Sequence, residues 1–188
     1  MVCRLLMARL SSDATLLART AEGDGAAFQQ LLQRHSQSVL NVIYRIVLSR
    51  ADAEDLCQEV FVRLWKQAPD WQDDAKLSTW LHRVASNLAI NHCQRFQRRH
   101  VVDAELAECL SEEAEGRGDD AYARQAEPLR ESLAQLSEEQ RAALAFRYYR
   151  ELPVKEIAKI LDSTPKAVES LLGRARKRLR EVLGKRDD

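Results

Sequence analysis

The sequence predicts an all-α protein with two small helical domains joined by a flexible acidic linker, the C-terminal domain containing a helix-turn-helix. Apolar residues recur at spacings of three and four along most of the 188 residues, and no stretch alternates like a half-buried strand. Only 4 Pro and 6 Gly interrupt the chain. The charges form two opposed blocks, which separate an acidic middle from a basic C-terminal segment.

The opposed blocks cancel, because 29 acidic and 29 basic residues leave no net charge. Between positions 101 and 131 ten acids accompany three arginines, whereas between 166 and 186 eight cations accompany two glutamates. Duplex DNA repels the first block and attracts the second. We therefore predict that residues 100–128 form a linker that stays away from duplex DNA, in a basic channel of a partner.

The four cysteines, at positions 3, 57, 93 and 109, form no Cys-x-x-Cys pair. This spacing argues against a disulfide framework or a zinc site, so we expect reduced thiols in a cytoplasmic protein without metal or cofactor. The sequence has no nucleophile–base pair or phosphate-binding loop, and we do not expect an enzyme. No apolar run reaches membrane-spanning length. Residues 1–12 are expected to be a disordered extension, with Met1 or Met7 as the natural start.

The N-terminal half begins with a short helix capped by Asp13 and ended by Gly23-Asp24-Gly25. A long helix is predicted next, and His35 on its apolar face favours a packed, hydrogen-bonded histidine over a ligand. The apolar face of this helix also contains Phe28, Leu31, Leu32, Val39, Val42, Ile43 and Ile46.

A third helix is predicted over 52–66, with Asp52 as N-cap and acids in its first turn, where the helix dipole favours them. Its apolar face is wide and consists of Leu56, Cys57, Val60, Phe61 and Leu64. The opposite face is mixed and consists of Asp55, Gln58, Glu59, Val62 and Lys66. Its composition alone is typical of a solvated helix surface.

Residues 71–77 are predicted to form a loop, after which Ser78 caps a helix from 79 to about 98. One stripe of this helix is apolar and points to a core. A second stripe steps round by three and four residues and consists of Trp80, Arg83, Asn87, Asn91, Gln94, Arg95 and Arg98. Aromatic, amide and guanidinium groups in this order suit an unpaired DNA strand. A polar helix surface with Trp80 partly buried is an equally good interpretation.

The C-terminal half resumes near residue 129. Ser137 and Gln140 form a capping box that opens a helix ending before Pro153. Two short amphipathic helices follow, the second beginning at Pro165 with Thr164 as N-cap. Their spacing and their tight turn predict a helix-turn-helix. The second helix carries polar groups off its apolar stripe, namely Lys166, Ser170, Arg174, Lys177 and Arg178. An αα-hairpin with a solvated basic face is the alternative.

Five segments together resemble a sigma factor of the extracytoplasmic-function group of the sigma-70 family. They are DAEDLCQEVF at 52–61, STWLHRVA at 78–85, YREL at 149–152, EIA at 156–158 and RARKRL at 174–179. The resemblance covers the chain from about Asp13 to Leu183. It implies a region 2-like domain at 13–99 and a region 4-like domain at 129–186. It also implies that the acidic linker threads towards the polymerase active site.

The resemblance also implies roles for particular residues. Docking on core RNA polymerase is assigned to Asp55, Gln58, Glu59, Val62 and Lys66. Opening and reading of the −10 element is assigned to Trp71, Asp73, Asp74, Lys76, Trp80, Arg83, Asn87, Asn91, Arg95 and Arg98. Reading of the −35 element as duplex is assigned to Thr164, Lys166, Glu169, Ser170, Arg174 and Lys177. The partners implied are core polymerase, promoter DNA and an inhibitory anti-sigma factor that can be membrane-anchored, with no membrane insertion by the chain itself.

Two departures from the resemblance affect the DNA-reading helix. Many relatives have Gly in the turn where this chain has Asp162, and many have Arg at the positions of Glu169 and Leu171. Glu169 would accept from a cytosine amino group but repel phosphate, so the −35 sequence is left open. Two alternative functions also remain: a conventional helix-turn-helix regulator that binds duplex DNA as a dimer, and a helical protein-interaction adaptor.

Overall fold

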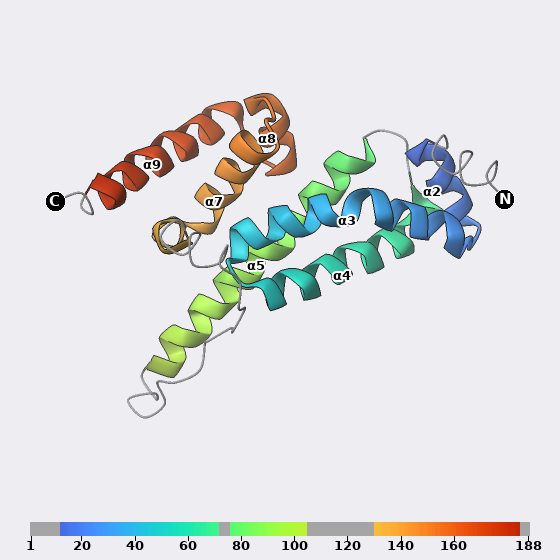
Figure 1. The fold of residues 1–188 in the computed structure, drawn as a ribbon, viewed down its shortest axis with the longest axis horizontal. Helices are drawn as coiled ribbons and strands as arrows, with labels where there is room; N and C mark the ends of the chain where they lie inside the picture. The colour runs from blue at the N-terminus through green and yellow to red at the C-terminus, as the bar shows by residue number, and fades with distance from the viewer. Residues whose placement is uncertain (1–11, 72–75, 105–129, 185–188) are drawn as a thin grey trace, which may run out of the picture.

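The computed structural model describes residues 12–71, 76–104 and 130–184, and these are helical apart from the connections (Figure 1). The N-terminal half contains α2 (Asp13–Ala21), α3 (Gly25–Val47), α4 (Arg50–Gln67), the 3-10 turn η1 (Ala68–Asp70) and α5 (Leu77–Ala104). The C-terminal half contains a helical stretch at 130–134, α7 (Glu138–Leu144), the π-helical turn η2 (Ala145–Tyr149), α8 (Val154–Ile160) and α9 (Pro165–Gly184). The described residues form no strand, so the all-α prediction is confirmed.

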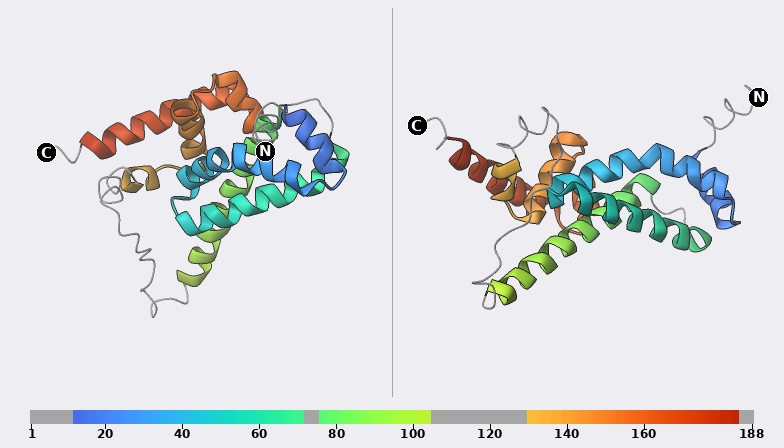
Figure 2. Two further views of the ribbon diagram at one scale, coloured as in Figure 1. Left: turned by 45° about the vertical axis from the view of Figure 1, so that its right-hand side comes forward. Right: turned by 60° about the horizontal axis from the view of Figure 1, so that its bottom comes forward.

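Helices α3, α4 and α5 pack on one another, and α2 closes one end of this bundle (Figures 1 and 2). The apolar face predicted for the long helix is the centre of the core, where Leu31, Val42, Ile43 and Ile46 are fully buried. The second unit is formed by α7, α8 and α9 and lies against α3 and α5. One cluster of buried apolar side chains runs through both units. None of the described helices is long and apolar enough to cross a membrane.

Three predicted N-caps are wrong by one to three residues. Ser12, not Asp13, caps α2 by accepting from the Thr15 N–H, and Ser49, not Asp52, caps α4 by accepting from the Asp52 N–H. In both cases a serine upstream has the extended backbone that an N-cap requires, and the acid then lies in the first turn. The third is Ser78, because α5 already begins at Leu77.

Asp13 has another role, since its carboxylate joins α2 to α3. It lies 3.0 Å from Arg34 Nη1 and 2.8 Å from His35 Nε2. His35 is therefore a half-buried, hydrogen-bonded histidine, as predicted. The break between these helices is also confirmed: Gly23 has a φ of 87°, and Asp24 caps α3 by accepting from the N–H groups of Ala26 and Ala27.

The C-terminal helix opened by Ser137 has the predicted capping box, with both reciprocal hydrogen bonds present. It does not remain α-helical up to Pro153, however. From residue 145 it widens into η2, where the Arg150 N–H donates to the Ala145 carbonyl five residues back. Such a π-turn shifts the side chains that follow relative to a regular helix. Tyr149, at the end of η2, contacts α3 as a result of this placement.

Helix α5 continues to Ala104, beyond the predicted end near residue 98. Its C-terminal end projects past the bundle (Figures 1 and 2). The first residues of the predicted linker, 100–104, are therefore helical. The rest of that linker, and the predicted N-terminal extension up to residue 11, lie outside the described residues.

Candidate nucleic-acid and protein-docking surfaces

The first candidate surface is the α4 face, which consists of Asp55, Gln58, Glu59, Val62 and Lys66. All five side chains are exposed, because the opposite side of α4 buries Cys57, Val60, Phe61 and Leu64 in the core. The face is not purely polar: Val62 is 46% exposed, and the neighbouring Trp65 is 39% exposed. Exposed apolar groups among charges are typical of a protein-docking surface.

The second candidate surface is the α5 row, which consists of Trp80, Arg83, Asn87, Asn91 and Arg95. The last four are exposed and follow one another at intervals of four residues, so they lie along one side of the helix. Trp80 is half-buried and packs edge-to-face on Trp71, with ring centroids 5.7 Å apart. This placement agrees with the interpretation of a polar helix surface with Trp80 partly buried, and contact of the row with an unpaired DNA strand stays a prediction.

A pocket of about 370 Å³ is lined by Trp71 of this pair. Trp71, Lys76, Leu77 and Ser78 form one wall, and Asp13, Ala14 and Leu17 of α2 form another. An aromatic wall next to a cation suits a flat base with an attached phosphate. Asp73 and Asp74 lie outside the described residues. Arg98 lies in α5, but its side chain is also outside them.

The third candidate surface belongs to the helix-turn-helix formed by α8 and α9. Ile157 and Val168 are fully buried between the helices, and Ala158 permits their close approach. The Ala167 N–H donates to the Thr164 hydroxyl at 3.2 Å, so the predicted N-cap is confirmed. Asp162 has a φ of 50°, the left-handed conformation that favours Gly and that Asp tolerates better than most residues.

The side of α9 turned away from α8 is the α9 face. All six of its predicted DNA-reading side chains are exposed: Thr164, Lys166, Glu169, Ser170, Arg174 and Lys177. Arg174 and Lys177 form no ion pair with another described residue, so their charge is available to a phosphate. The basic face is thus placed on the second helix of the motif, the element that enters the major groove in such proteins.

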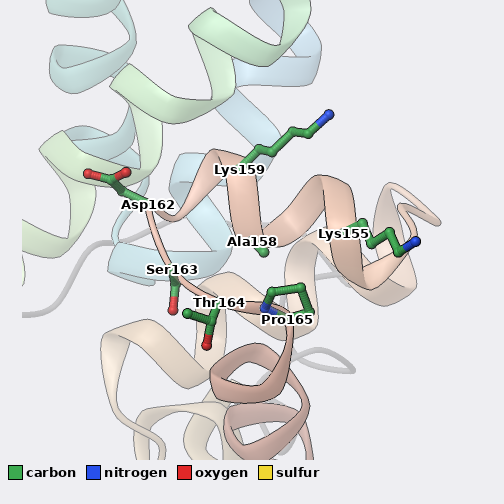
Figure 3. A pocket seen from close by; sticks show the side chains of 7 residues that line it. All are labelled: Lys155, Ala158, Lys159, Asp162, Ser163, Thr164 and Pro165. Carbon is green, nitrogen blue, oxygen red and sulfur yellow. The ribbon is translucent and has the colours of Figure 1, made fainter.

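The structure adds two cations that sequence reasoning missed. A shallow groove of about 570 Å³ follows the turn and is lined by Lys155, Ala158, Lys159, Asp162, Ser163, Thr164 and Pro165 (Figure 3). The hydroxyls of Ser163 and Thr164 point to one side of the turn, whereas Asp162 lies towards α5 (Figure 3). Lys155 and Lys159 are both exposed and four residues apart on α8. That spacing was visible in the sequence and fits phosphate contacts by the first helix.

Three buried titratable groups lie beneath these surfaces. Burial, followed by the charges of Arg150 and His35, lowers the pKa of His82 to about 4, so its ring is neutral at pH 7. Burial raises the pKa of the Cys57 and Cys93 thiols, which are therefore protonated. No cluster of three or more metal-ligating side chains occurs in the described part of the chain.

The N-terminal unit exposes a row of aromatic, amide and guanidinium groups, and the C-terminal unit exposes a basic helix. These two surfaces suit a protein that contacts DNA at two places. Residues 31–100 match the family described as Sigma-70 region 2, and residues 126–179 match Sigma-70, region 4. The RNA polymerase sigma-H factor of Pseudomonas aeruginosa is 30% identical over 91% of this chain and 93% of its own length. The ECF RNA polymerase sigma-E factor of Escherichia coli is 30% identical over 90% of this chain and 93% of its own length.

Solved structures show the same fold. CnrH in complex with the cytosolic domain of CnrY superposes with a TM-score of 0.70 at 24% identity, covering 93% of this chain and 99% of that one. The sigma factor RpoE of Bartonella quintana, in complex with the anti-sigma factor NepR, has a TM-score of 0.64 at 22% identity and covers 84% of this chain and 96% of its own.

The chain therefore belongs to the sigma-70 family of RNA polymerase sigma factors, in its extracytoplasmic-function group. Its function is promoter-specific initiation of transcription as a subunit of RNA polymerase. The conventional helix-turn-helix regulator is not favoured, because the matched regions include the N-terminal unit, which such a regulator does not require.

Proposed function

We propose that this sigma factor docks on core RNA polymerase through the α4 face, opens and holds the −10 element with the α5 row, and reads the −35 element with the α9 face. The observation that carries this proposal is that two chemically distinct surfaces are exposed on two helical units. We place the boundaries of these units at residues 13–99 and 129–186, with the acidic residues between them as linker.

For the −10 element, the amides of Asn87 and Asn91 bond base edges, while Arg83, Arg95 and Arg98 follow the phosphates. Trp71 and Trp80 provide aromatic surface for stacking, and Asp73, Asp74 and Lys76 belong to the loop that holds an extruded base. Unstacking costs a few kcal/mol per step. Stacking on an aromatic side chain, at about 1–3 kcal/mol per base, offsets that cost.

For the −35 element, Lys166, Arg174 and Lys177 neutralise phosphates, and Lys155 and Lys159 add phosphate contacts from α8. Thr164, Ser170 and Glu169 contact base edges, and each good contact contributes about 1–3 kcal/mol of discrimination. Neither unit needs to bind tightly alone, because polymerase holds both and their binding energies combine.

We further propose that an anti-sigma factor inhibits the chain until a signal arrives, and that this partner can be anchored in a membrane. The support comes from structural relatives, one of which is bound to an anti-sigma factor and another to the cytosolic domain of its partner. We assign the protein to the cytoplasm, and we expect no catalytic activity of its own and no cofactor.

In vitro transcription with core polymerase on genomic fragments tests the proposal. We expect promoter-dependent starts only when the protein is added, and none with a variant carrying Arg174→Glu and Lys177→Glu. If this variant supports initiation as well as the wild type does, the α9 face does not read DNA. A chain that fails to bind core polymerase overturns the whole assignment of surfaces. Purification from the native cell, with and without stress, tests for the anti-sigma factor.

A further inference from the structure

Gly173 lies near the middle of α9, where the fold itself gives no reason for a glycine. A glycine inside a helix lowers the folding equilibrium constant by a factor of roughly two to five relative to alanine, because it loses more backbone freedom on folding. Two other glycines have local explanations. Gly23 has a φ of 87° at the break after α2, and Gly25 is the first residue of α3.

The structure excludes two common uses of glycine at position 173. The backbone there is ordinary right-handed helix, so no positive φ requires a glycine. A Cβ on Gly173 would meet no atom within 4 Å beyond the backbone of its own helical turns, so close packing against the described part of the chain does not require one either. The remaining use of glycine is to let another molecule approach the backbone closely.

Gly173 is also at the centre of the α9 face. Ser170 precedes it by three residues and Lys177 follows it by four, and these spacings place all three on one side of the helix. Lys166, about two turns earlier, and the adjacent Arg174 add cations around the same position. Helix α9 runs along the outside of the C-terminal unit, and these four side chains are exposed (Figure 1). A molecule that binds the α9 face therefore passes over Gly173.

The missing side chain uncovers the helical turn before it. Side chains in a helix lean towards its N-terminus, so a side chain at position 173 would cover the surface over Glu169 and Ser170. Neither of these two side chains forms a hydrogen bond or an ion pair with another residue in the described ranges. The carboxylate of Glu169 and the hydroxyl of Ser170 are thus available to the groups that base pairs present in the major groove.

We propose that Gly173 is a specificity-determining position. It leaves a notch, the open space over Gly173, in which the edges of the −35 base pairs approach the backbone of α9 closely enough for Ser170 and Glu169 to read them. This inference rests on the proposed reading of the −35 element by the α9 face. The cations around the notch contact phosphates and hold the helix in the groove, so the notch affects sequence discrimination rather than charge. Beneath Glu169 a cytosine is favoured, because its N4 amino group donates to a carboxylate.

The substitutions Gly173→Ala and Gly173→Leu test this inference, because the stability of the fold and the affinity for DNA should change in opposite directions. Urea unfolding of the full chain measures the stability. We expect Gly173→Ala to lower the equilibrium constant for unfolding roughly two- to fivefold, since alanine favours the helix and the space around it is open. Gly25→Ala is the matched control, because it adds the same methyl group to a helical glycine with equally open surroundings, on α3. A Gly173→Ala chain less stable than the wild type would mean that the notch is not open, which overturns the proposal.

Fluorescence anisotropy of the holoenzyme on promoter fragments measures the affinity for DNA. We expect Gly173→Leu to weaken binding at least about tenfold, and Gly173→Ala to weaken it less, because one good base contact contributes roughly 5- to 150-fold. Replacing the −35 element by unrelated sequence should abolish the difference from the wild type. The salt slope of log Kd should not change, because no charge is altered. Gly25→Ala should bind like the wild type.

A folded Gly173→Leu chain that binds the −35 element like the wild type overturns the proposal, since DNA then does not enter the notch. An equal loss on fragments with and without the −35 element overturns it as well, because the substitution then affects something other than sequence reading. If Gly173→Leu does not fold, the same two comparisons with Gly173→Ala decide. A wild-type holoenzyme whose binding does not depend on the −35 sequence would instead show that the proposed function of the α9 face has failed. That failure is seen without any variant, so it is distinct from a failure of the notch.

Discussion

The two helices that we propose to read DNA, α5 and α9, differ in how much of their surface is buried in the fold. Helix α5 buries one side in its own bundle and another against α7 and α8, so the α5 row is the strip that remains. Helix α9 packs mainly on α7 and α8 and leaves the whole α9 face to solvent. The difference agrees with the two proposed targets, because aromatic and amide groups suit a melted strand, whereas exposed cations suit the phosphates of duplex DNA.

Because the α9 face is exposed, we expect the removal of its charges to weaken promoter binding more than any other substitution considered below. We expect Arg174→Glu with Lys177→Glu to weaken binding of holoenzyme to promoter fragments roughly a hundredfold, and to reduce the salt slope of log Kd by about two. Fluorescence anisotropy at several salt concentrations measures both quantities. Arg50→Glu, at an exposed position at the start of α4, serves as control. A loss that does not vary with salt would show that phosphates are not the target.

The α5 row should affect a different step. We expect Trp80→Ala, and to a smaller extent Asn87→Ala, to slow opening of the promoter about tenfold, since stacking contributes about 1–3 kcal/mol per base. Binding to duplex −35 DNA should be unchanged, and a template with a preformed bubble should restore initiation. Permanganate reactivity of the −10 region measures the opening. The control is Gln33→Ala, which removes an exposed amide outside the row.

Trp80→Ala also truncates a half-buried ring that packs on Trp71, so its thermal unfolding must be measured alongside. If Asn87→Ala, which leaves the core intact, opens the promoter normally both on linear templates and at low temperature, the row does not read the melted strand. Only α9 would then keep a proposed role in reading DNA.

Features determined by neighbouring residues could be predicted from the sequence. Thr164 and Pro165 fix the start of α9, Ser137 and Gln140 fix that of α7, and the apolar stripe of α9 determines which side remains exposed. The sequence does not decide between two good N-cap residues that lie close together. Ser49 precedes Asp52, both are good N-caps, and only the backbone geometry shows which of them is used.

The interface between the units could not be predicted, because its partners are far apart in the chain. Arg141 and Ile46 are 95 residues apart, and Tyr149 and Asn41 are 108 apart. No periodic pattern links such positions, and Arg141 reads as one more helix arginine in the sequence. The π-turn that brings Tyr149 to α3 has no sequence signature either.

The burial of α5 on two sides should also make stability depend on pH. The pKa of His82 is lowered to about 4 in the folded chain, whereas the ordinary value is 6.5. The unfolded chain therefore binds more protons between pH 4 and 6.5, and the folded state loses stability as pH falls through this window. Between pH 7 and pH 5 the loss from this group is about 1–2 kcal/mol.

Urea unfolding at pH 7 and pH 5 measures this dependence. Carboxylates titrate as well, so the relevant quantity is the difference between the wild type and His82→Gln, which cannot titrate but retains a group able to bond Ser38. We expect the variant to lose less stability between the two pH values. Equal losses would mean that His82 is not buried as a neutral ring against Phe146 of η2.

The smallest expected effect concerns Asp162, whose carboxylate lies 3.3 Å from Arg83 of the α5 row. Its φ of 50° is unfavourable for any residue with a Cβ, so Asp162→Gly should relieve backbone strain and stabilise the fold. Two effects oppose this stabilisation: Gly is more flexible in the unfolded chain, and the ion pair with Arg83 is lost. An exposed ion pair is worth little, about 0–1 kcal/mol. In urea unfolding we expect Asp162→Gly to be more stable than the wild type by about 0.5 kcal/mol, and Asp162→Ala to be less stable by about 1 kcal/mol.

Asp162→Asn tolerates the same backbone conformation without the charge, so it isolates the contribution of the ion pair. If Asp162→Ala is as stable as Asp162→Gly, the turn does not adopt the left-handed conformation, and the geometry that brings Asp162 to Arg83 must be different.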